Sequence, residues 1–247
     1  MSAERYINAA KDLITKIEES QLDVIHQVAE LVSNAIINEK LVFIFGAGHS
    51  NILAIECFSR AGGLGNVQPM LDAGLDYGSG SQRQSGFERL PGYAKCMVND
   101  YGIGEGDLVI IISNSGRNPV PVEMALEVKK LGAKVVALTS LAHSNAVTSN
   151  DPSGKKLMEV ADIVIDNGCP PGDAMIELPG LLPKVGPGST VAGAVILNSI
   201  ITQAAQIVLE KGGMPPVAFS GNLPEAKEYN VKFHELRQKF TRQMRHR

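Results

Sequence analysis

The stretch DLVIIISNSGRNPVPVEMALEVKKLGAKVVALTS, residues 107–140, has the pattern of one strand, one helix and a second strand. Its two ends, DLVIIIS and AKVVALTS, are apolar at successive positions, which is typical of strands buried on both faces of a sheet. The middle, PVPVEMALEVKKLG, has a helical pattern that starts at a proline and stops at a glycine. A helix that joins two such strands predicts a parallel pair.

The same alternation continues on both sides of this unit. Further short apolar runs predict strands in KLVFIFGAG (40–48), NVQPML (66–71) and ADIVIDN (161–167). Apolar residues at three-to-four spacing predict helices over 3–39, 51–63, 189–211 and from Pro224 onward. We expect loops at the Gly/Ser-rich residues 71–86 and the Pro/Gly-rich residues 167–188. The fold class is therefore α/β, with helices on both faces of a parallel sheet.

The composition limits the classes of partner. The 247 residues are 44% hydrophobic and 20% charged, which is enough for one buried core. A net charge of −3 and the absence of tryptophan give no support to a nucleic-acid partner or an anionic membrane surface. No apolar run reaches the length of a membrane span, the N-terminus is charged, and the three cysteines and five histidines are scattered. We expect a cytoplasmic protein with no membrane contact, no cofactor and no metal site.

Two loops suggest a ligand: FGAGHSN (45–51) and SNSGRNP (113–119). Each follows a buried strand and precedes a helix, and ligands of open α/β sheets bind beyond the carboxyl ends of the strands. Glycines permit close backbone approach, hydroxyls donate hydrogen bonds, and a helix N-terminus is the positive end of a dipole. These features predict a phosphate site with neutral donors at Ser50, Ser113, Ser115 and Asn118.

Other interpretations of these loops stay open. GAGHSN is similar to the start of a dinucleotide fingerprint, and Asp72 lies about where a ribose-binding acid belongs, but Asn51 replaces the third glycine. Neither loop has the Gly-Lys-Ser/Thr of a P-loop, and Ser115 lacks the Gly-x-Ser-x-Gly elbow of an esterase. Tight turns without a ligand are the remaining explanation, and they account less well for two loops with matched hydroxyls.

FGAGHS, followed further along by IIISNSGRNPVPVEMALEVKKLGAKVVALTS, resembles the SIS (sugar isomerase) domain over roughly residues 40–211. RAGGL, FERLPGYA, DPSGKKL and PPGDA are similar to a bacterial group of SIS proteins related to phosphoheptose isomerase and N-acetylmuramic acid-6-phosphate etherase. The resemblance implies a three-layer α/β/α sandwich with a five-stranded parallel sheet. It also implies a sugar phosphate as ligand, with the phosphate held by Ser50, Ser113, Asn114, Ser115, Gly116 and Asn118.

The chain departs from these relatives where their chemistry lies. Phosphoheptose isomerase and the etherase place a glutamate ten residues after the first-loop serine, and this chain has Arg60 there. Phosphoheptose isomerase also has a histidine on the late helix, and residues 189–211 contain none. The expected function is therefore an aldose–ketose isomerase for a sugar phosphate. The alternatives are a lyase of the etherase type and a binding protein without catalysis.

Isomerisation and ether cleavage both need a carboxylate or imidazole that moves a proton. The candidates are Glu56 or Glu88 as the base and His49 as the acid, with His143 next. Glu56 is explained equally well as an ion-pair partner of Arg60, one turn later on the helix. Glu88 follows the Gly/Ser-rich loop, where it either closes over the ligand or caps a helix, and His49 is either a site residue or a packed side chain.

Three segments make up the expected organisation: N-terminal helices over 1–39, the SIS domain over 40–211, and a C-terminal loop and basic helix over 212–247. The helix 189–211 has apolar residues on too many sides for one buried face. Pairing of helices between subunits would cover them, so we expect a homodimer or homotetramer.

Overall fold

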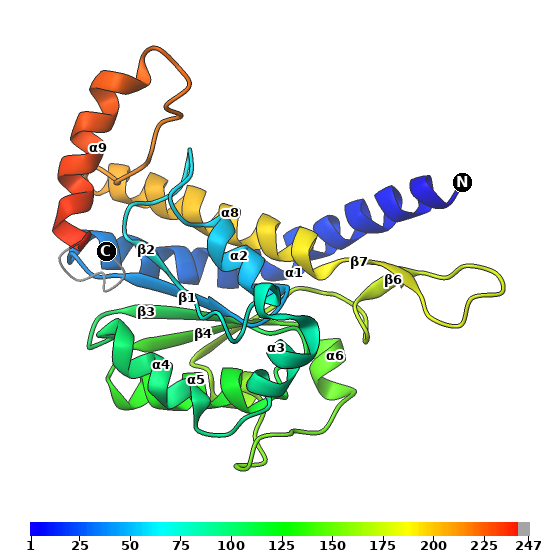
Figure 1. Ribbon diagram of the computed structural model, residues 1–247. Helices are drawn as coiled ribbons and strands as arrows, with labels where there is room; N and C mark the ends of the chain where they lie inside the picture. Colours follow the sequence, from blue (N-terminus) through cyan, green and yellow to red (C-terminus); the bar gives the residue numbers. More distant parts are fainter. Residues whose placement is uncertain (242–247) are drawn as a thin grey trace.

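The computed structural model describes residues 1–241 and has a five-stranded parallel sheet at its centre (Figure 1). The strands are β1 (Val42–Gly46), β2 (Val67–Met70), β3 (Leu108–Ile112), β4 (Lys134–Thr139) and β5 (Ile163–Asp166). Their order is β2-β1-β3-β4-β5, so the chain adds strands first on one side of β1 and then on the other. The predicted α/β class and five-stranded parallel sheet are confirmed.

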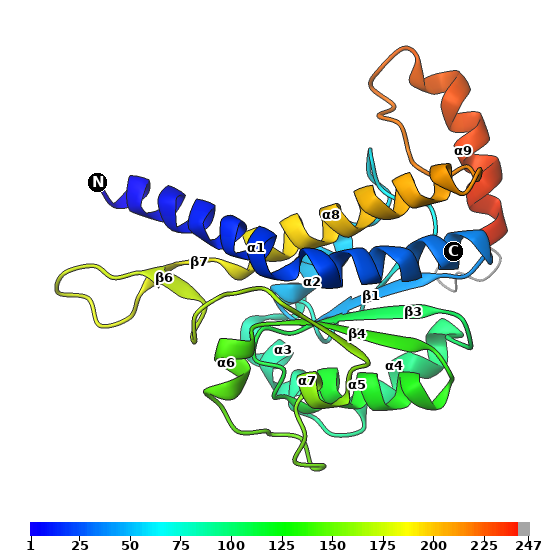
Figure 2. The ribbon, with the colours of Figure 1, turned by 180° about the vertical axis from the view of Figure 1, so that it is seen from behind.

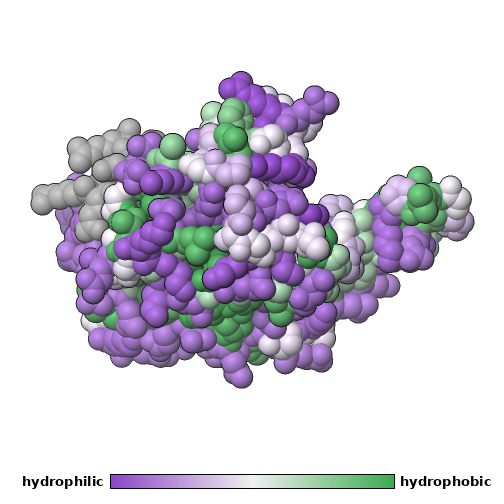
Figure 3. Space-filling view, turned by 90° about the horizontal axis from the view of Figure 1, so that it is seen from below, coloured by the Kyte–Doolittle hydropathy of each residue, from purple (hydrophilic) through white to green (hydrophobic). Residues whose placement is uncertain are grey.

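Helices form a layer on each side of the sheet (Figures 1 and 2). One layer contains α1 (Ser2–Ile37), α2 (Ser50–Glu56) and α8 (Ser189–Glu210). The other side carries α3 (Ser81–Glu88), α4 (Tyr93–Tyr101), α5 (Pro119–Lys130), α6 (Leu141–Asn145) and α7 (Leu157–Val160). A last helix, α9 (Ala226–Thr241), stands out from the body at one end (Figure 1). Hydrophilic side chains cover most of the face seen in Figure 3.

The two faces of each strand supply two separate cores. In β1, Val42 and Ile44 pack with α1 and α8, whereas Phe43 and Phe45 pack with α4 and α5. All four side chains are at most 2% exposed. Successive strand residues point to opposite faces, and here both faces are covered. The unbroken apolar runs of the sequence follow from this double burial.

The apolar helix α8 packs along α1 in the layer above the sheet (Figure 2). By length and composition alone α8 could span a membrane, but half of its apolar window is buried inside the fold. The buried side chains of α8 include Ile196, Leu197, Ile200, Ile207 and Val208. Burial of one such side chain contributes roughly 1.5–3 kcal/mol. The composition that suggested subunit contacts is therefore largely explained by contacts within the chain.

Two segments expected to be loops contain regular structure. Residues 71–86 include a short 3₁₀ helix, η1 (Tyr77–Ser79), and most of α3. Residues 167–188 contain the antiparallel pair β6 (Ala174–Ile176) and β7 (Val185–Pro187). This hairpin projects beside the N-terminal part of α1, and the Tyr6 hydroxyl donates to the Pro187 carbonyl at 2.9 Å (Figure 1). Both segments gain order from contacts with distant residues, which local composition does not reveal.

Candidate functional site

A cavity of about 230 Å³ lies at the carboxyl ends of β1 and β3. The strand order changes direction between these two strands, where ligands of open α/β sheets bind. The cavity is lined by Ala47, Ser50, Glu88, Ile112, Ser113, Asn114, Ser115, Asn118, Pro121 and His143. Thus both loops of the sequence analysis meet at one place, together with the end of α3 and residues that follow β4.

The first loop turns sharply between β1 and α2. A Cβ on Gly46 would lie 2.5 Å from the Ser50 backbone, so only glycine permits this approach. The Gly48 amide donates to the Leu75 carbonyl at 2.8 Å, which fixes the loop to the segment that follows β2. Ser50 lies at the start of α2 and lines the cavity.

His49 is exposed and lines a narrow slot next to the cavity. Ser50 and Asn114 line both the slot and the cavity. Its Nδ1 atom is 3.1 Å from the Tyr77 hydroxyl, and the two rings pack with centroids 4.6 Å apart. The hydrogen bond with Tyr77 uses Nδ1, so Nε2 is the ring nitrogen that is left for a further hydrogen bond. The structure thus places His49, a residue of the first loop, at the edge of the cavity.

The second loop is held in shape by its own side chains. The Gly116 amide donates to Ser113 Oγ at 3.2 Å, and Gly116 has φ of 59°, a conformation that favours glycine. The Thr139 hydroxyl donates to the Asn114 carbonyl at 3.1 Å. Ser115 is half-buried, and its hydroxyl has no protein hydrogen bond among the residues that the structure describes. The turn therefore presents a free hydroxyl to the cavity.

The two asparagines of this loop are occupied by protein partners. Asn114 Oδ1 accepts from Asn167 Nδ2 at 2.9 Å. Asn118 Nδ2 donates to Glu88 Oε1 at 2.9 Å, and Asn118 Oδ1 accepts from Asn150 Nδ2 at 3.0 Å. The side-chain amide of Asn118, which was expected to donate to a phosphate, here donates to Glu88 and connects it to the loop that contains Asn150.

Glu88 is the last residue of α3 and lines the cavity with Ser113 and Ser115. Its Oε1 atom accepts from Asn118, and its Oε2 atom accepts from Gln84 Nε2 at 3.0 Å. Both oxygens therefore act as acceptors. A carboxylate has about four lone-pair directions, so it can hold these two bonds and still take a proton.

Glu56 lies elsewhere. It forms an ion pair with Arg60, is about a third exposed, and lines none of the described cavities around the phosphate loops. Six residues of helix separate it from Ser50, which rotates its side chain about 120° away around the axis of α2. The structure therefore does not bring Glu56 to the cavity, and the ion-pair interpretation accounts for it.

His143, at the start of the segment after β4, lines the same cavity as Glu88. Burial lowers the pKa of His143, Asp173 partly offsets that effect, and Arg117 adds to it. Its Nδ1 atom is 3.5 Å from Asn114 Nδ2. The structure thus places an imidazole with a lowered pKa in the same cavity as the Glu88 carboxylate, although the sequence ranked His143 below His49.

Asp72 is not available for a ribose. Its Oδ1 atom accepts from the Tyr93 hydroxyl at 2.6 Å and from the Gly74 amide at 2.7 Å. Burial, followed by the bond to Asp72, raises the pKa of Tyr93 to about 12, so this hydroxyl stays a donor. These bonds fix the segment after β2, and they argue against the dinucleotide interpretation.

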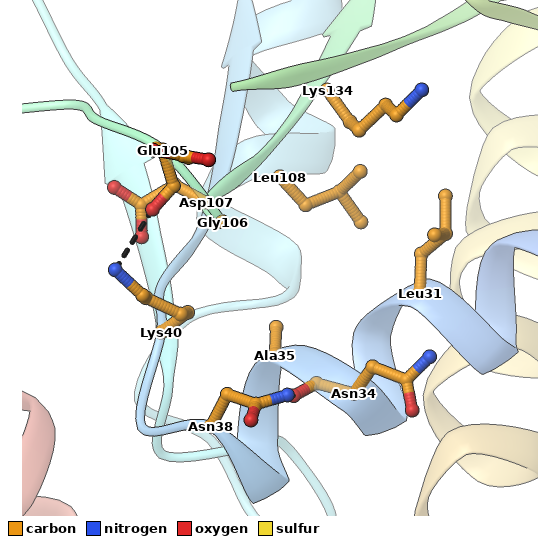
Figure 4. A pocket seen from close by; sticks show the side chains of 10 residues that line it. All are labelled: Leu31, Asn34, Ala35, Asn38, Lys40, Glu105, Gly106, Asp107, Leu108 and Lys134. Carbon is orange, nitrogen blue, oxygen red and sulfur yellow. Dashed lines mark hydrogen bonds between the residues drawn. The ribbon is translucent and has the colours of Figure 1, made fainter. Parts of the chain in front are cut away.

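A larger recess of about 520 Å³ lies at the amino ends of the strands, far from both loops (Figure 4). Its polar groups are mostly used inside the fold. Asp107 accepts from the Leu41 and Gly104 amides, and Lys40 Nζ donates to the Glu105 carbonyl at 2.8 Å. Leu31, Ala35 and Leu108 form its apolar floor. This recess serves the packing of α1 on the sheet and lacks the converging free donors of the loop site.

Within the described residues no three His, Cys, Asp or Glu side chains are grouped as metal ligands.

A sequence model of the SIS domain matches residues 5–140, more than half of the chain. UPF0309 protein TTE0306 of Caldanaerobacter subterraneus subsp. tengcongensis is 41% identical over 244 residues, which cover 98% of each chain. The chain belongs to the SIS domain family, among the UPF0309 proteins. UPF0309 protein GK1441 of Geobacillus kaustophilus is 40% identical over 229 residues, 93% of this chain and 90% of that protein. The resemblance found in the sequence is confirmed.

Solved structures show the same fold. Phosphoheptose isomerase GmhA from Neisseria gonorrhoeae has a TM-score of 0.55 at 14% identity, covering 83% of this SIS chain and 96% of that chain. The Vibrio vulnificus NanR protein, in complex with ManNAc-6P, has a TM-score of 0.55 at 16% identity, covering 86% of this chain and 65% of that chain. At these identities the likeness shows the fold alone.

Proposed function

We propose that this SIS protein binds a sugar phosphate in the cavity between its two loops and interconverts the aldose and ketose forms. One observation carries the proposal: the Glu88 carboxylate lines the same cavity as Ser113 and Ser115. The SIS family and the two structural neighbours, a phosphoheptose isomerase and a protein complexed with ManNAc-6P, support a ligand of this class.

The phosphate is expected on the second loop. The Ser115 hydroxyl has no protein partner among the described residues. The backbone amides of Ser115, Arg117 and Asn118 likewise donate no hydrogen bond to a backbone carbonyl of the described residues. The Gly116 amide is already used by Ser113 Oγ. The N-terminus of α5 adds a positive dipole end. We therefore assign the phosphate to Ser115 and these three amides, with Ser113 shaping the turn and Ser50 facing it.

The chemistry follows from the carboxylate and the imidazoles. Glu88 takes the proton from the carbon next to the carbonyl, and an acid protonates the carbonyl oxygen, which gives an enediol. Return of the proton from Glu88 to the neighbouring carbon, with loss of the proton of the other enediol hydroxyl to the conjugate base of that acid, forms the new carbonyl and completes the isomerisation. His143 shares the cavity with Glu88, and His49 lies at its edge, so these two are the candidates for ring opening and oxygen protonation.

Proton exchange tests the reaction directly. The protein is incubated in D₂O with pentose, hexose, heptose, amino-sugar and muramic phosphates, and NMR follows both rearrangement and deuterium incorporation. The change Glu88→Gln should lower turnover by about 10²–10⁴-fold with little effect on affinity, as for removal of a general base. Glu56→Gln makes the same chemical change on the neighbouring layer, outside the cavity, and should keep turnover.

The other outcomes separate the alternatives. Release of lactate from a muramic phosphate would assign the lyase reaction instead. Calorimetric binding of a sugar phosphate without any turnover or exchange would assign a binding protein without catalysis. Equal turnover by wild type and Glu88→Gln would remove Glu88 from the mechanism.

A further inference from the structure

A chain of hydrogen bonds reaches Glu88 from the far side of the second loop. Arg117 donates from its guanidinium to Asn150 Oδ1 at 2.7 Å. Asn150 Nδ2 donates to Asn118 Oδ1 at 3.0 Å, and Asn118 Nδ2 donates to Glu88 Oε1 at 2.9 Å. These four residues join the phosphate loop, the segment between α6 and α7, and the end of α3. We call this set of four the amide relay.

The direction of the amide relay is fixed by its first member. A guanidinium only donates, so Asn150 must turn its oxygen to Arg117 and its nitrogen to Asn118. Asn118 must then turn its oxygen to Asn150 and its nitrogen to Glu88. Each amide orientation is therefore dictated by chemistry, and the relay ends in a donor that faces the Glu88 carboxylate.

We propose that Asn118 is a positioning residue that holds Glu88 over the phosphate loop, and that Asn150 and Arg117 fix Asn118 in that role. This inference rests on the proposed function, in which Glu88 is the base. Asn118 is 7% exposed. The backbone amide of Asn150 also donates to the backbone carbonyl of Arg117 at 2.8 Å, which fixes these two residues relative to each other. Gln84 holds the second carboxylate oxygen at 3.0 Å from the same helix as Glu88.

The relay predicts a specific exchange of partners. In Asn118→Asp, a carboxylate oxygen replaces the donor that faces Glu88, and two acceptors oppose each other. In Asn118→Asp with Glu88→Gln, the new glutamine amide donates to Asp, its oxygen still accepts from Gln84, and Asp still accepts from Asn150. Every hydrogen bond of the relay is restored with its direction reversed at one link.

The first readout does not depend on catalysis. Amide hydrogen exchange of α3 (Ser81–Glu88) should become about tenfold faster in Asn118→Asp, because a hydrogen bond to a charged group is lost. The double variant should return to the wild-type rate. Gln82→Glu adds the same charge to an exposed position of α3 and should leave the exchange unchanged. Unchanged exchange in Asn118→Asp, or no recovery in the double variant, would overturn the relay.

The second readout separates a positioning role from a phosphate ligand. Asn118→Asp should lower kcat by roughly 10²-fold, as for a misplaced catalytic group, with KM changed less than about threefold. The affinity for inorganic phosphate, measured by calorimetry, should show the same small change. A large loss of phosphate affinity with unchanged kcat would make the Asn118 side chain a phosphate ligand and overturn the positioning role. If wild type turns over no sugar phosphate, the proposed function fails, while hydrogen exchange still decides the relay.

Discussion

Replacement of Ser115 by alanine tests the phosphate site most directly. The Ser115 hydroxyl is half-buried at the cavity and has no protein partner among the described residues, so its removal breaks no bond of the fold. A hydrogen bond to a charged group contributes about 1.5–3 kcal/mol. With 1.4 kcal/mol per factor of ten, Ser115→Ala should weaken sugar-phosphate binding about tenfold to a hundredfold. The thermal stability should change little.

Ser113→Ala supplies the informative contrast. Ser113 is 8% exposed, and its oxygen accepts from the Gly116 amide at 3.2 Å, so this change also loosens the turn. It should lower both affinity and stability, the latter by about 1 kcal/mol. Ser199→Ala, at a half-buried position of α8 outside the cavity, is the matched control for Ser115→Ala. Calorimetry and thermal unfolding measure the two effects. Equal affinity of wild type and Ser115→Ala would refute the placement of the phosphate.

Four further predictions follow. Asp173 accepts from Ser189 Oγ at 2.6 Å and from the Ser189 amide at 2.8 Å at the start of α8, so Asp173→Ala should cost about 0.5–2 kcal/mol of stability in urea unfolding. A thiol reagent should label only Cys96 in the folded protein, because burial raises the pKa of both Cys57 and Cys169 to about 12. Mass spectrometry of the peptides checks this, and label on Cys57 or Cys169 would contradict it. The lowered pKa of His143 means that the unfolded chain binds its proton first as pH falls, so stability should decrease below about pH 6.5, and less steeply in His143→Gln. We expect a homodimer or homotetramer that covers the exposed Ile52 and Ile55 of α2, so Ile55→Glu should lower the mass seen by sedimentation; a monomeric wild type would contradict this.

The fold was predictable because its signals are local. Double burial of β3 and β4 gives unbroken apolar runs, and the proline and glycine at the ends of α5 mark a crossover helix. The number of strands came from the resemblance of 107–140 and FGAGHS to a known domain, whereas the strand order was not predicted. The β6–β7 hairpin and α3 were missed because distant partners order them, such as Tyr6 on Pro187.

The site was predictable to the level of its loops but not of its side chains. The two loops meet because parallel strands present their carboxyl ends at one edge, which the pattern alone implies. The choice between Glu56 and Glu88 depended on where α2 ends and how it rotates, and a sequence does not show this. Asn150 and Gln84 gave no signal, since an amide partner 32 residues from Asn118 is recognised only once the segments are folded together.

Two features of this chain, its departure from the related enzymes at Arg60 and the amide at position 118, belong together under the proposed function. Arg60 stands where those enzymes place a glutamate on the helix after the first loop, and this SIS chain supplies Glu88 from a different segment. A base on α3 needs its own attachment to the phosphate loop, because α3 is not continuous with either loop. A threonine at position 118 would have one hydroxyl and could not donate to Glu88 while accepting from Asn150 with the same geometry. An asparagine has a donor and an acceptor on one rigid amide. The relocated base therefore requires an amide at position 118, and Asn118→Thr should lower kcat while keeping phosphate affinity. A wild-type kcat in that variant would show that the two features are independent.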